Sequence, residues 1–264
     1  MKRWVGLRRE IDKKKYIFIA VLSFVILIGG WFLIAGSGLV NKLFLPSPVK
    51  VVGNILETIG DGSLAANAGI SIYRIIMGFL MAVALGVPIG ILVGSFREAE
   101  ALIRPMCEFV RYMPVPAFVP LVMVWTGIGE MAKIVLVFLG TFFQLVLMVA
   151  DDASSVPEDL LSASYTMGAR RWSTIFKVLI PAMSPRLMET LRMCIGWAWT
   201  YLVVAELVAS GSGLGFSIMK AQKFFQTEAI FAGILIIGII GLITDRLFAL
   251  GIKLMFPWNE RSGS

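Results

Sequence analysis

The stretch Val156–Pro181, VPEDLLSASYTMGARRWSTIFKVLIP, decides how this chain folds. It is a polar, basic segment between two long apolar runs, so in a protein this hydrophobic it must lie in water beside a membrane. Pro157 predicts the first turn of a helix, and Glu158 is well placed at the positive end of that helix's dipole. Gly168 predicts a left-handed stop, because glycine adopts a positive φ without strain.

The composition around this stretch is that of a polytopic membrane protein. Of 264 residues, 58% are hydrophobic and 16% are charged, whereas a soluble domain has about 45–50% apolar and about 25% charged residues. The chain contains no histidine, which excludes histidine-based catalysis and histidine metal sites. Cys107 and Cys194 lie in or near apolar runs, so we expect neither a disulfide framework nor a metal site.

Six apolar segments are each close to the length of about 20 residues that a helix needs to cross a bilayer. The predicted spans are 16–35, 65–94, 102–125, 132–150, 178–208 and 228–248. The third span contains Pro105, Pro114, Pro116 and Pro120, so it must be broken or kinked. In the second span, the small residues between Gly86 and Gly90 predict a close helix crossing. The predicted fold class is therefore all-α, with six transmembrane helices.

The distribution of basic residues predicts the orientation. Seven of the 24 basic residues lie in residues 1–15, directly before the first span, which is the pattern of a cytoplasmic N-terminus. We expect a cytoplasmic N-terminus at 1–15, a transmembrane domain at 16–253 with a cytoplasmic loop at 152–177, and a cytoplasmic tail at 254–264. On the other side we expect a short surface helix at 49–59 and a flexible loop at 211–227.

The polar stretch also resembles a known motif, the EAA loop of ABC-importer permeases, which docks into the ATPase subunit. The positions that carry the resemblance are Ala163, Gly168, Val178, Ile180 and Pro181. The chain departs from the motif at Ser162 and Ser164, where glutamate and alanine are usual, and at Ile180, where leucine is usual. The coupling residues that the resemblance implies are Glu158, Ser162, Ala163, Ser164, Gly168, Arg170, Arg171 and Pro181. The alternative is an ordinary amphipathic helix on the membrane surface.

Four further segments, 45–48, 111–129, 205–207 and 213–215, are similar to one permease subfamily, which imports nitrate, bicarbonate, taurine and aliphatic sulfonates. The resemblance implies a type I ABC importer fold in a bacterial plasma (inner) membrane. It implies two permease copies, favouring a homodimer, two ATPase subunits that bind ATP and magnesium, and an extracytoplasmic substrate-binding protein. The residues themselves show no GxxxxGK[ST] loop, so we expect no ATP hydrolysis and no cofactor in this chain. Membrane lipids, and not nucleic acid, are the expected partners of its basic residues.

Residues that recur every seven positions suggest a translocation path. Arg192, Trp199 and Glu206 share one face of the fifth predicted helix and extend over about 21 Å. Gln144 and Arg111 complete the expected path, because intramembrane polar groups usually face a bundle interior or a cavity. For Arg111 the sequence favours a neutralising helix pair with Glu108, three residues earlier, over a place in the inner gate. The alternative is that the arginine and the glutamate reach the two membrane interfaces while the tryptophan packs.

Two other classes of protein are less well supported by the sequence. A secondary transporter working without an ATPase is the alternative function, but no internal repeat with matched broken helices is visible. An intramembrane enzyme would need a catalytic constellation, which we do not see. Arg74, in the second span, is interpreted as a structural or interfacial arginine in preference to an anion site.

Overall fold

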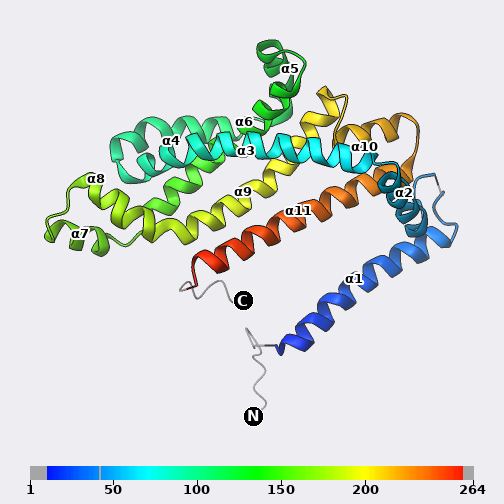
Figure 1. Cartoon of the computed structure of the whole chain (residues 1–264), viewed down its shortest axis with the longest axis horizontal. Helices are drawn as coiled ribbons and strands as arrows, with labels where there is room; N and C mark the ends of the chain where they lie inside the picture. Colours follow the sequence, from blue (N-terminus) through cyan, green and yellow to red (C-terminus); the bar gives the residue numbers. More distant parts are fainter. Residues whose placement is uncertain (1–10, 42, 258–264) are drawn as a thin grey trace.

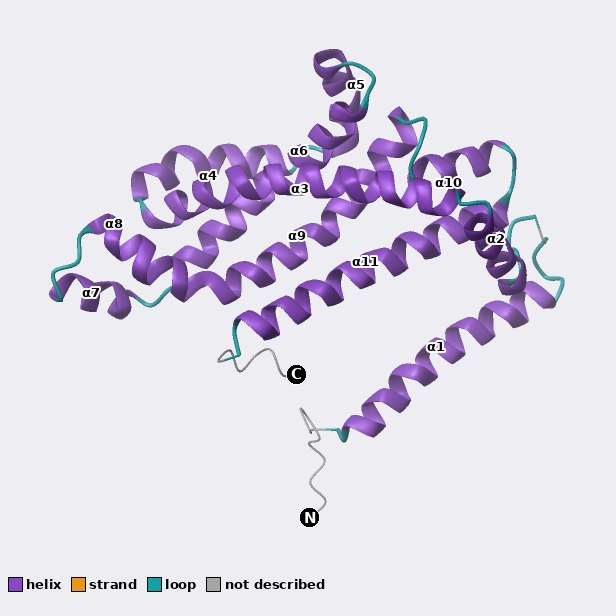
Figure 2. Cartoon of the chain, in the orientation of Figure 1, coloured by secondary structure: helices purple, strands orange, loops and turns teal. Residues whose placement is uncertain are grey.

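The computed structural model describes residues 11–41 and 43–257, and in these residues it contains helices and no strand (Figure 2). The helices are α1 (Lys13–Gly36), α2 (Pro48–Gly60), α3 (Ser63–Ser95), α4 (Arg97–Arg111), α5 (Val115–Thr126), α6 (Glu130–Ser154), α7 (Glu158–Thr166), α8 (Arg171–Thr174), a π-helical turn η1 (Ile175–Leu179), α9 (Ile180–Ala209), α10 (Leu214–Lys223) and α11 (Thr227–Met255). Within the described residues, five helices are long and apolar enough to cross a membrane, and the bent pair α4 and α5 makes a sixth span if it is counted as one. The predicted all-α, six-span fold is therefore confirmed.

The centre of the fold is the close packing of α3 against α6, because glycines on α3 remove the side chains that would hold the two helices apart. A Cβ atom added at Gly78 would lie 2.7 Å from the Val137 Cβ atom, and one added at Gly90 would lie 2.6 Å from the Val149 Cβ atom. Small residues permit this kind of backbone approach between membrane helices. The predicted close crossing in the second span is confirmed.

The proline-rich third span is broken, as its sequence predicts. Helices α4 and α5 meet at an angle of 102°. Pro114 is the N-cap of α5 and its φ of −66° leads into an extended ψ of 121°, so the α4 helix cannot continue through it. Figure 1 shows α5 projecting away from the bundle formed by α3, α4 and α6.

The fifth span begins earlier than the sequence predicts. Helix α8, the η1 turn and α9 form one apolar stretch, Arg171–Val208, whereas the expected span begins at residue 178. Pro181 is the second residue of α9, two residues after the π-helical turn ends. Since proline has no backbone N–H to continue the regular ladder, the hydrogen bonding shifts by one residue just before it.

The bundle has two distinct ends, which Figure 1 shows at opposite sides of the view. One end carries α7 and α8, and the other carries α2 and α10. The α10 end differs from expectation, because residues 211–227 contain a regular helix where a flexible loop is predicted. Helix α1 lies apart from the other long helices and is joined to them at α2, where the Trp31 ring stacks on Phe231 of α11.

Candidate coupling and translocation site

Helix α7 is a short, independently capped element between the two central spans α6 and α9. Gly168 has a φ of +83°, so the predicted left-handed stop is confirmed. The backbone N–H of Ala169 donates to the Ser164 carbonyl at 3.0 Å, and that of Gly168 donates to the Tyr165 carbonyl at 2.9 Å. These two bonds define a Schellman motif, which satisfies carbonyls that the helix end would otherwise leave unpaired. A β-branched residue would strain this turn, because it resists a positive φ.

The polar stretch turns one side outward and one side inward. Ser164 is buried, and its hydroxyl lies 2.9 Å from the Thr174 hydroxyl, which ties α7 to α8. The other coupling residues expected from the sequence are exposed, namely Glu158, Ser162, Ala163, Gly168, Arg170, Arg171 and Pro181. Apolar side chains stand out beside them, with Met167 88% exposed and Tyr165 51% exposed. An exposed apolar patch next to small residues is typical of a surface that contacts another protein.

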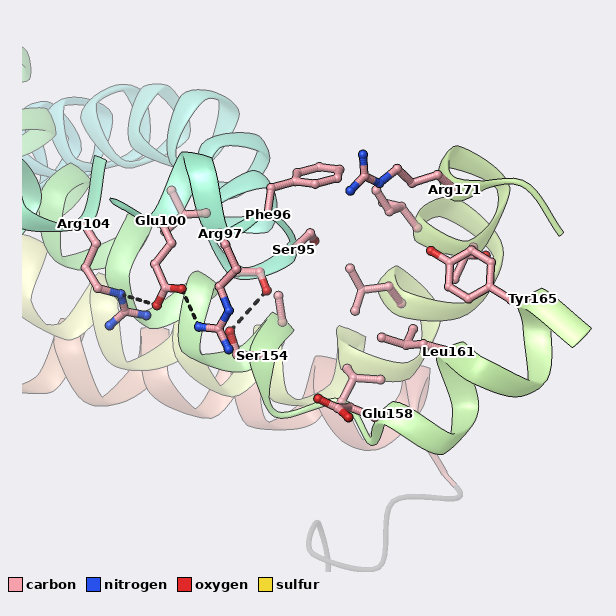
Figure 3. A pocket seen from close by; sticks show the side chains of 17 residues that line it. Ser95, Phe96, Arg97, Glu100, Arg104, Ser154, Glu158, Leu161, Tyr165 and Arg171 are labelled. Carbon is pink, nitrogen blue, oxygen red and sulfur yellow. Dashed lines mark hydrogen bonds and ion pairs between the residues drawn. The ribbon is translucent and has the colours of Figure 1, made fainter. Parts of the chain in front are cut away.

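A cavity of about 500 Å³ lies between this element and the junction of α3 with α4 (Figure 3). Its wall carries charged groups of both signs, including Arg97 and Glu100, which form an ion pair at 2.8 Å. The Arg171 guanidinium stands over the Phe96 ring, 4.6 Å from its centroid. Residue 96 is the link between α3 and α4. The start of α8 is therefore in direct contact with the turn that joins two membrane helices.

At the α10 end, Arg74 of α3 forms the centre of a buried ionic cluster. Its side chain is fully buried and lies 2.6 Å from carboxylate oxygens of both Glu130 and Glu206. It also donates to the carbonyl and the hydroxyl of Ser212, at 2.8 and 2.9 Å. A second hydrogen bond to Glu130, from Nη2 at 2.7 Å, brings the guanidinium to five hydrogen bonds, one for each of its donors. The interpretation of Arg74 as a structural arginine agrees with this geometry.

The segment after α9 closes over Glu206 in the same cluster. The Glu206 carboxylate accepts hydrogen bonds from the Ser71 hydroxyl at 2.8 Å and from the Gly215 backbone N–H at 2.8 Å. A Cβ atom added at Gly215 would lie 2.8 Å from the Glu206 Cβ atom. Glycine at this position therefore lets the α9–α10 segment lie directly on the glutamate. The motif segments 205–207 and 213–215 are two parts of one structural unit.

The expected line of path residues on α9 differs from what the structure shows. Trp199 is 7% exposed and Glu206 is 0% exposed, so within this protomer both face other helices. Trp199 belongs to the apolar core. Arg192 forms a two-point ion pair with Asp245 of α11, with one contact at 2.6 Å. A spacing of seven identifies a shared helix face but not which neighbour covers it.

The side of α6 and α9 that is left open carries different residues. On α6 these are Gly140, Gln144 and Met148, and on α9 they are Met193, Trp197 and Tyr201; we call this set the open face. Met193 is 51% exposed and Trp197 is 40% exposed. Of the expected path residues, Gln144 lies on the open face and Arg111 borders it.

Two cavities bridge α6 and α9 along the open face. One, of about 310 Å³, lies at the α4–α5 break and is lined by Arg111, Gly140 and Tyr201. The other, of about 540 Å³, lies towards α7 and is lined by Asp151, Arg186 and Met193. Gln144 stands on the same side of α6 as the residues of both cavities. The open face is therefore a continuous, partly polar surface over much of the length of these helices.

Sequence reasoning missed two features of this arrangement. It did not predict the ion pair between Arg74 and Glu206, which are 132 residues apart in the chain. Two opposite intramembrane charges are nevertheless a signal for pairing. It also missed the open face, because Met193 and Trp197 are apolar. Their separation of four residues gives them one helix face, but apolar residues on a membrane helix carry no sign of whether they face lipid, protein or water.

Comparison with known proteins identifies the class. Residues 86–254 match the family described as binding-protein-dependent transport system inner membrane component. The matched region contains α7, both cavities and the open face. The chain belongs to this family, and it is a multi-pass permease of the ABC-importer type.

Individual relatives are similar in sequence to this chain over nearly its whole length. The chain is 35% identical to the aliphatic sulfonates transport permease protein SsuC of Bacillus subtilis, over 97% of this chain and 93% of that protein. It is 30% identical to the taurine transport system permease protein TauC of Escherichia coli, over 93% of this chain and 91% of that protein. Among solved structures, the MetNI methionine ABC transporter has a similar chain, with a TM-score of 0.60 and 20% identity over 70% of this chain and 94% of that chain. This last likeness confirms the type I importer fold.

Proposed function

We propose that this chain forms the translocation path of an ATP-driven importer for small organic or inorganic anions, with sulfonates as the favoured class. The observation that carries the proposal is the combination of a family match over residues 86–254 with an exposed, capped helix α7 between the two helices of the open face. The sulfonate class is supported by the substrates in the names of SsuC and TauC. It also suits a cavity on the open face that contains an arginine.

Coupling would take place at α7. Its exposed small residues, Ser162 and Ala163, let a partner approach the backbone, and exposed Met167 offers an apolar anchor. A cytoplasmic ATPase subunit is the partner that the family implies. Displacement of α7 would move α8 through the Ser164–Thr174 hydrogen bond, and α8 continues into α9, which carries half of the open face.

The path would lie between the open faces of two copies of the chain. Each protomer leaves this face partly exposed, and a polar surface at membrane depth is stable only if it faces protein or water. In this arrangement α7 and both termini lie in the cytoplasm, and α2 and α10 lie on the outer side. A substrate-binding protein would deliver the anion at the α10 end.

Arg192 retains a supporting role in this proposal. Its ion pair with Asp245 connects α9 to α11, so it would hold the inner half of α9 in place beside the path. Trp199 and Glu206 would support the path from behind, through the core and the ionic cluster. The lining itself is assigned to Gln144, Arg111 and the open face.

Reconstitution tests the proposal against a secondary transporter. The full chain is placed in liposomes together with an ATPase subunit and a binding protein encoded beside it, and uptake of labelled taurine, ethanesulfonate or nitrate is measured. ATP-dependent uptake of an anion is expected, with none when the ATPase carries an inactivated nucleotide site. Uptake that follows a proton or sodium gradient and ignores ATP would contradict the proposal.

A further inference from the structure

Arg111 is an unusual residue because it is a charged group beside the middle of the bundle without an acidic partner. Its cavity is lined on α6 by Gly140, which lies ten residues after Glu130 and fourteen before Ser154. At about 1.5 Å per residue, this places the cavity about 15 Å and about 21 Å from the two ends of α6. An arginine at this depth is costly unless it lines a polar cavity or has a partner.

Three other arginines in or near the spans do have such partners. Arg74, Arg104 and Arg192 each lie within 4.0 Å of a carboxylate. Among the residues that the structure describes, Arg111 has no carboxylate within that distance. Its polar contacts within the described part of the chain are to Tyr112, with a hydrogen bond from Nη2 to the phenol oxygen at 3.1 Å and the guanidinium carbon 4.9 Å from the ring centroid. Most of its donors are therefore free to bind a ligand.

A second phenol completes the same cavity. Tyr201 of α9 packs its ring over Gly140, where an added Cβ atom would lie 2.5 Å from the Cδ2 atom of the ring. Its hydroxyl has no hydrogen-bond partner among the described residues, and it lines the same 310 Å³ cavity as Arg111. A guanidinium and phenol hydroxyls are donors that suit an oxyanion, and an arginine in particular can bind two of its oxygens at once. The remaining wall is apolar, with Pro114 and Phe143 among the lining residues.

We propose that Arg111, Tyr112 and Tyr201 form an anion subsite halfway along the path, for the head group of a sulfonate or a similar small oxyanion. The inference rests on the proposed transport function. A cavity of this size is near the lower end of the range for small-molecule sites. Lipid phosphate is excluded as the regular occupant by depth, because head groups lie at the ends of α6. The subsite would select by charge after the binding protein has released its ligand.

The test compares the reaction of one cysteine with two reagents of opposite charge. The full chain carries Met113→Cys at the cavity wall in a Cys107→Ala, Cys194→Ala background. Reaction rates are measured with the anionic sulfonatoethyl and the cationic trimethylammonioethyl methanethiosulfonates. Arg111→Gln should lower the ratio of anionic to cationic rate by about tenfold, since one nearby charge acts in a weakly screening environment. Arg111→Lys should restore most of the ratio, and Arg97→Gln, on the same helix and exposed, should leave it unchanged.

A competition arm identifies the chemistry of the ligand. Ethanesulfonate should slow the anionic reagent in the chain with Arg111 more strongly than chloride at the same ionic strength. Added phosphatidylglycerol should have no such effect. An unchanged rate ratio in Arg111→Gln, or equal protection by chloride, would overturn the subsite.

These measurements need no ATPase, so they separate the two proposals. If the wild-type transporter shows ATP-driven anion uptake but the rate ratio ignores Arg111, the subsite is wrong and the transport function stands. If the ratio depends on Arg111 but no ATP-driven uptake is found, the anion site stands and the transport proposal is wrong. In the full transporter, Arg111→Gln should raise the KM for anion uptake by tenfold or more.

Discussion

At the scale of single residues, Arg74 and Arg111 show that two arginines of the same membrane domain can have different roles because their surroundings differ. Arg74 is fully buried and has two carboxylates and a serine around it. Arg111 faces a cavity and has one tyrosine. Buried paired charges hold neighbouring helices in register, whereas an unpaired charge in a cavity can accept a ligand. The first arginine is assigned to structure and the second to transport.

Removing the charge of Glu206 should considerably lower the free energy of unfolding of the protein. Glu206→Gln leaves Arg74 buried with one carboxylate in place of two, and breaking a buried pair costs about 3 kcal/mol or more. Thermal unfolding of the purified chain in detergent measures the effect. Glu130→Gln is the matched comparison, because the Glu130 side chain is 50% exposed and can be solvated. Equal losses for the two variants would contradict the assignment of Glu206 to the buried core of the cluster.

At the scale of elements, two glycines of α3 should respond in opposite ways to the same substitution. Gly90→Ala places a Cβ atom 2.6 Å from the Val149 Cβ atom, whereas nothing lies within 4 Å of the Cβ position at Gly69. The first change should destabilise by about 1–3 kcal/mol through overpacking. The second should stabilise by about 0.5–1 kcal/mol, because alanine is the better helix former. The unfolding midpoints of both variants in detergent are compared with that of the wild-type chain. An unchanged midpoint for Gly90→Ala would show that α3 and α6 are not held at this separation.

The end of α7 makes a prediction about coupling. Gly168→Val cannot adopt a φ of +83° without strain, so it should disturb the Schellman turn and reduce ATP-driven uptake at least tenfold while the protein still inserts into the membrane. Gly168→Asn is the control, since asparagine tolerates the left-handed region, and it should retain most of the uptake. The measurements are uptake in liposomes and the amount of ATPase that co-purifies. Full uptake by the valine variant would argue that α7 does not transmit the ATPase motion.

At the scale of the whole molecule, the sequence was sufficient for the class of fold and for its spans. Long apolar runs, the prolines of the third span and the capping glycine of α7 act locally, so their effects could be read in order along the chain. Helix α10 was missed, because the glycines at 211–215 resemble a flexible loop until the burial of Glu206 beneath them is known. The early start of the fifth span was missed because the charges of Arg171 and Lys177 favour a water-exposed connector.

The functional face was harder to predict than the fold. The heptad of Arg192, Trp199 and Glu206 is real, but helices α3 and α11 cover that side of α9 through Arg74 and Asp245. Which face of a helix is covered depends on contacts between residues far apart in sequence. In a membrane protein, hydrophobicity does not reveal it, because lipid and protein core favour the same side chains.

The central claim is that the open face, and not the line from Arg192 to Glu206, forms the path of an ATP-driven importer. The most direct measurement compares Trp197→Cys with Trp199→Cys in the assembled transporter, in a Cys107→Ala, Cys194→Ala background, using a charged thiol reagent. Trp197 is 40% exposed and Trp199 is 7% exposed. We expect labelling at 197 that changes at least severalfold between the nucleotide-free and ATP-bound states, and little labelling at 199 in either state. Strong, nucleotide-dependent labelling at 199 with none at 197 would contradict the account.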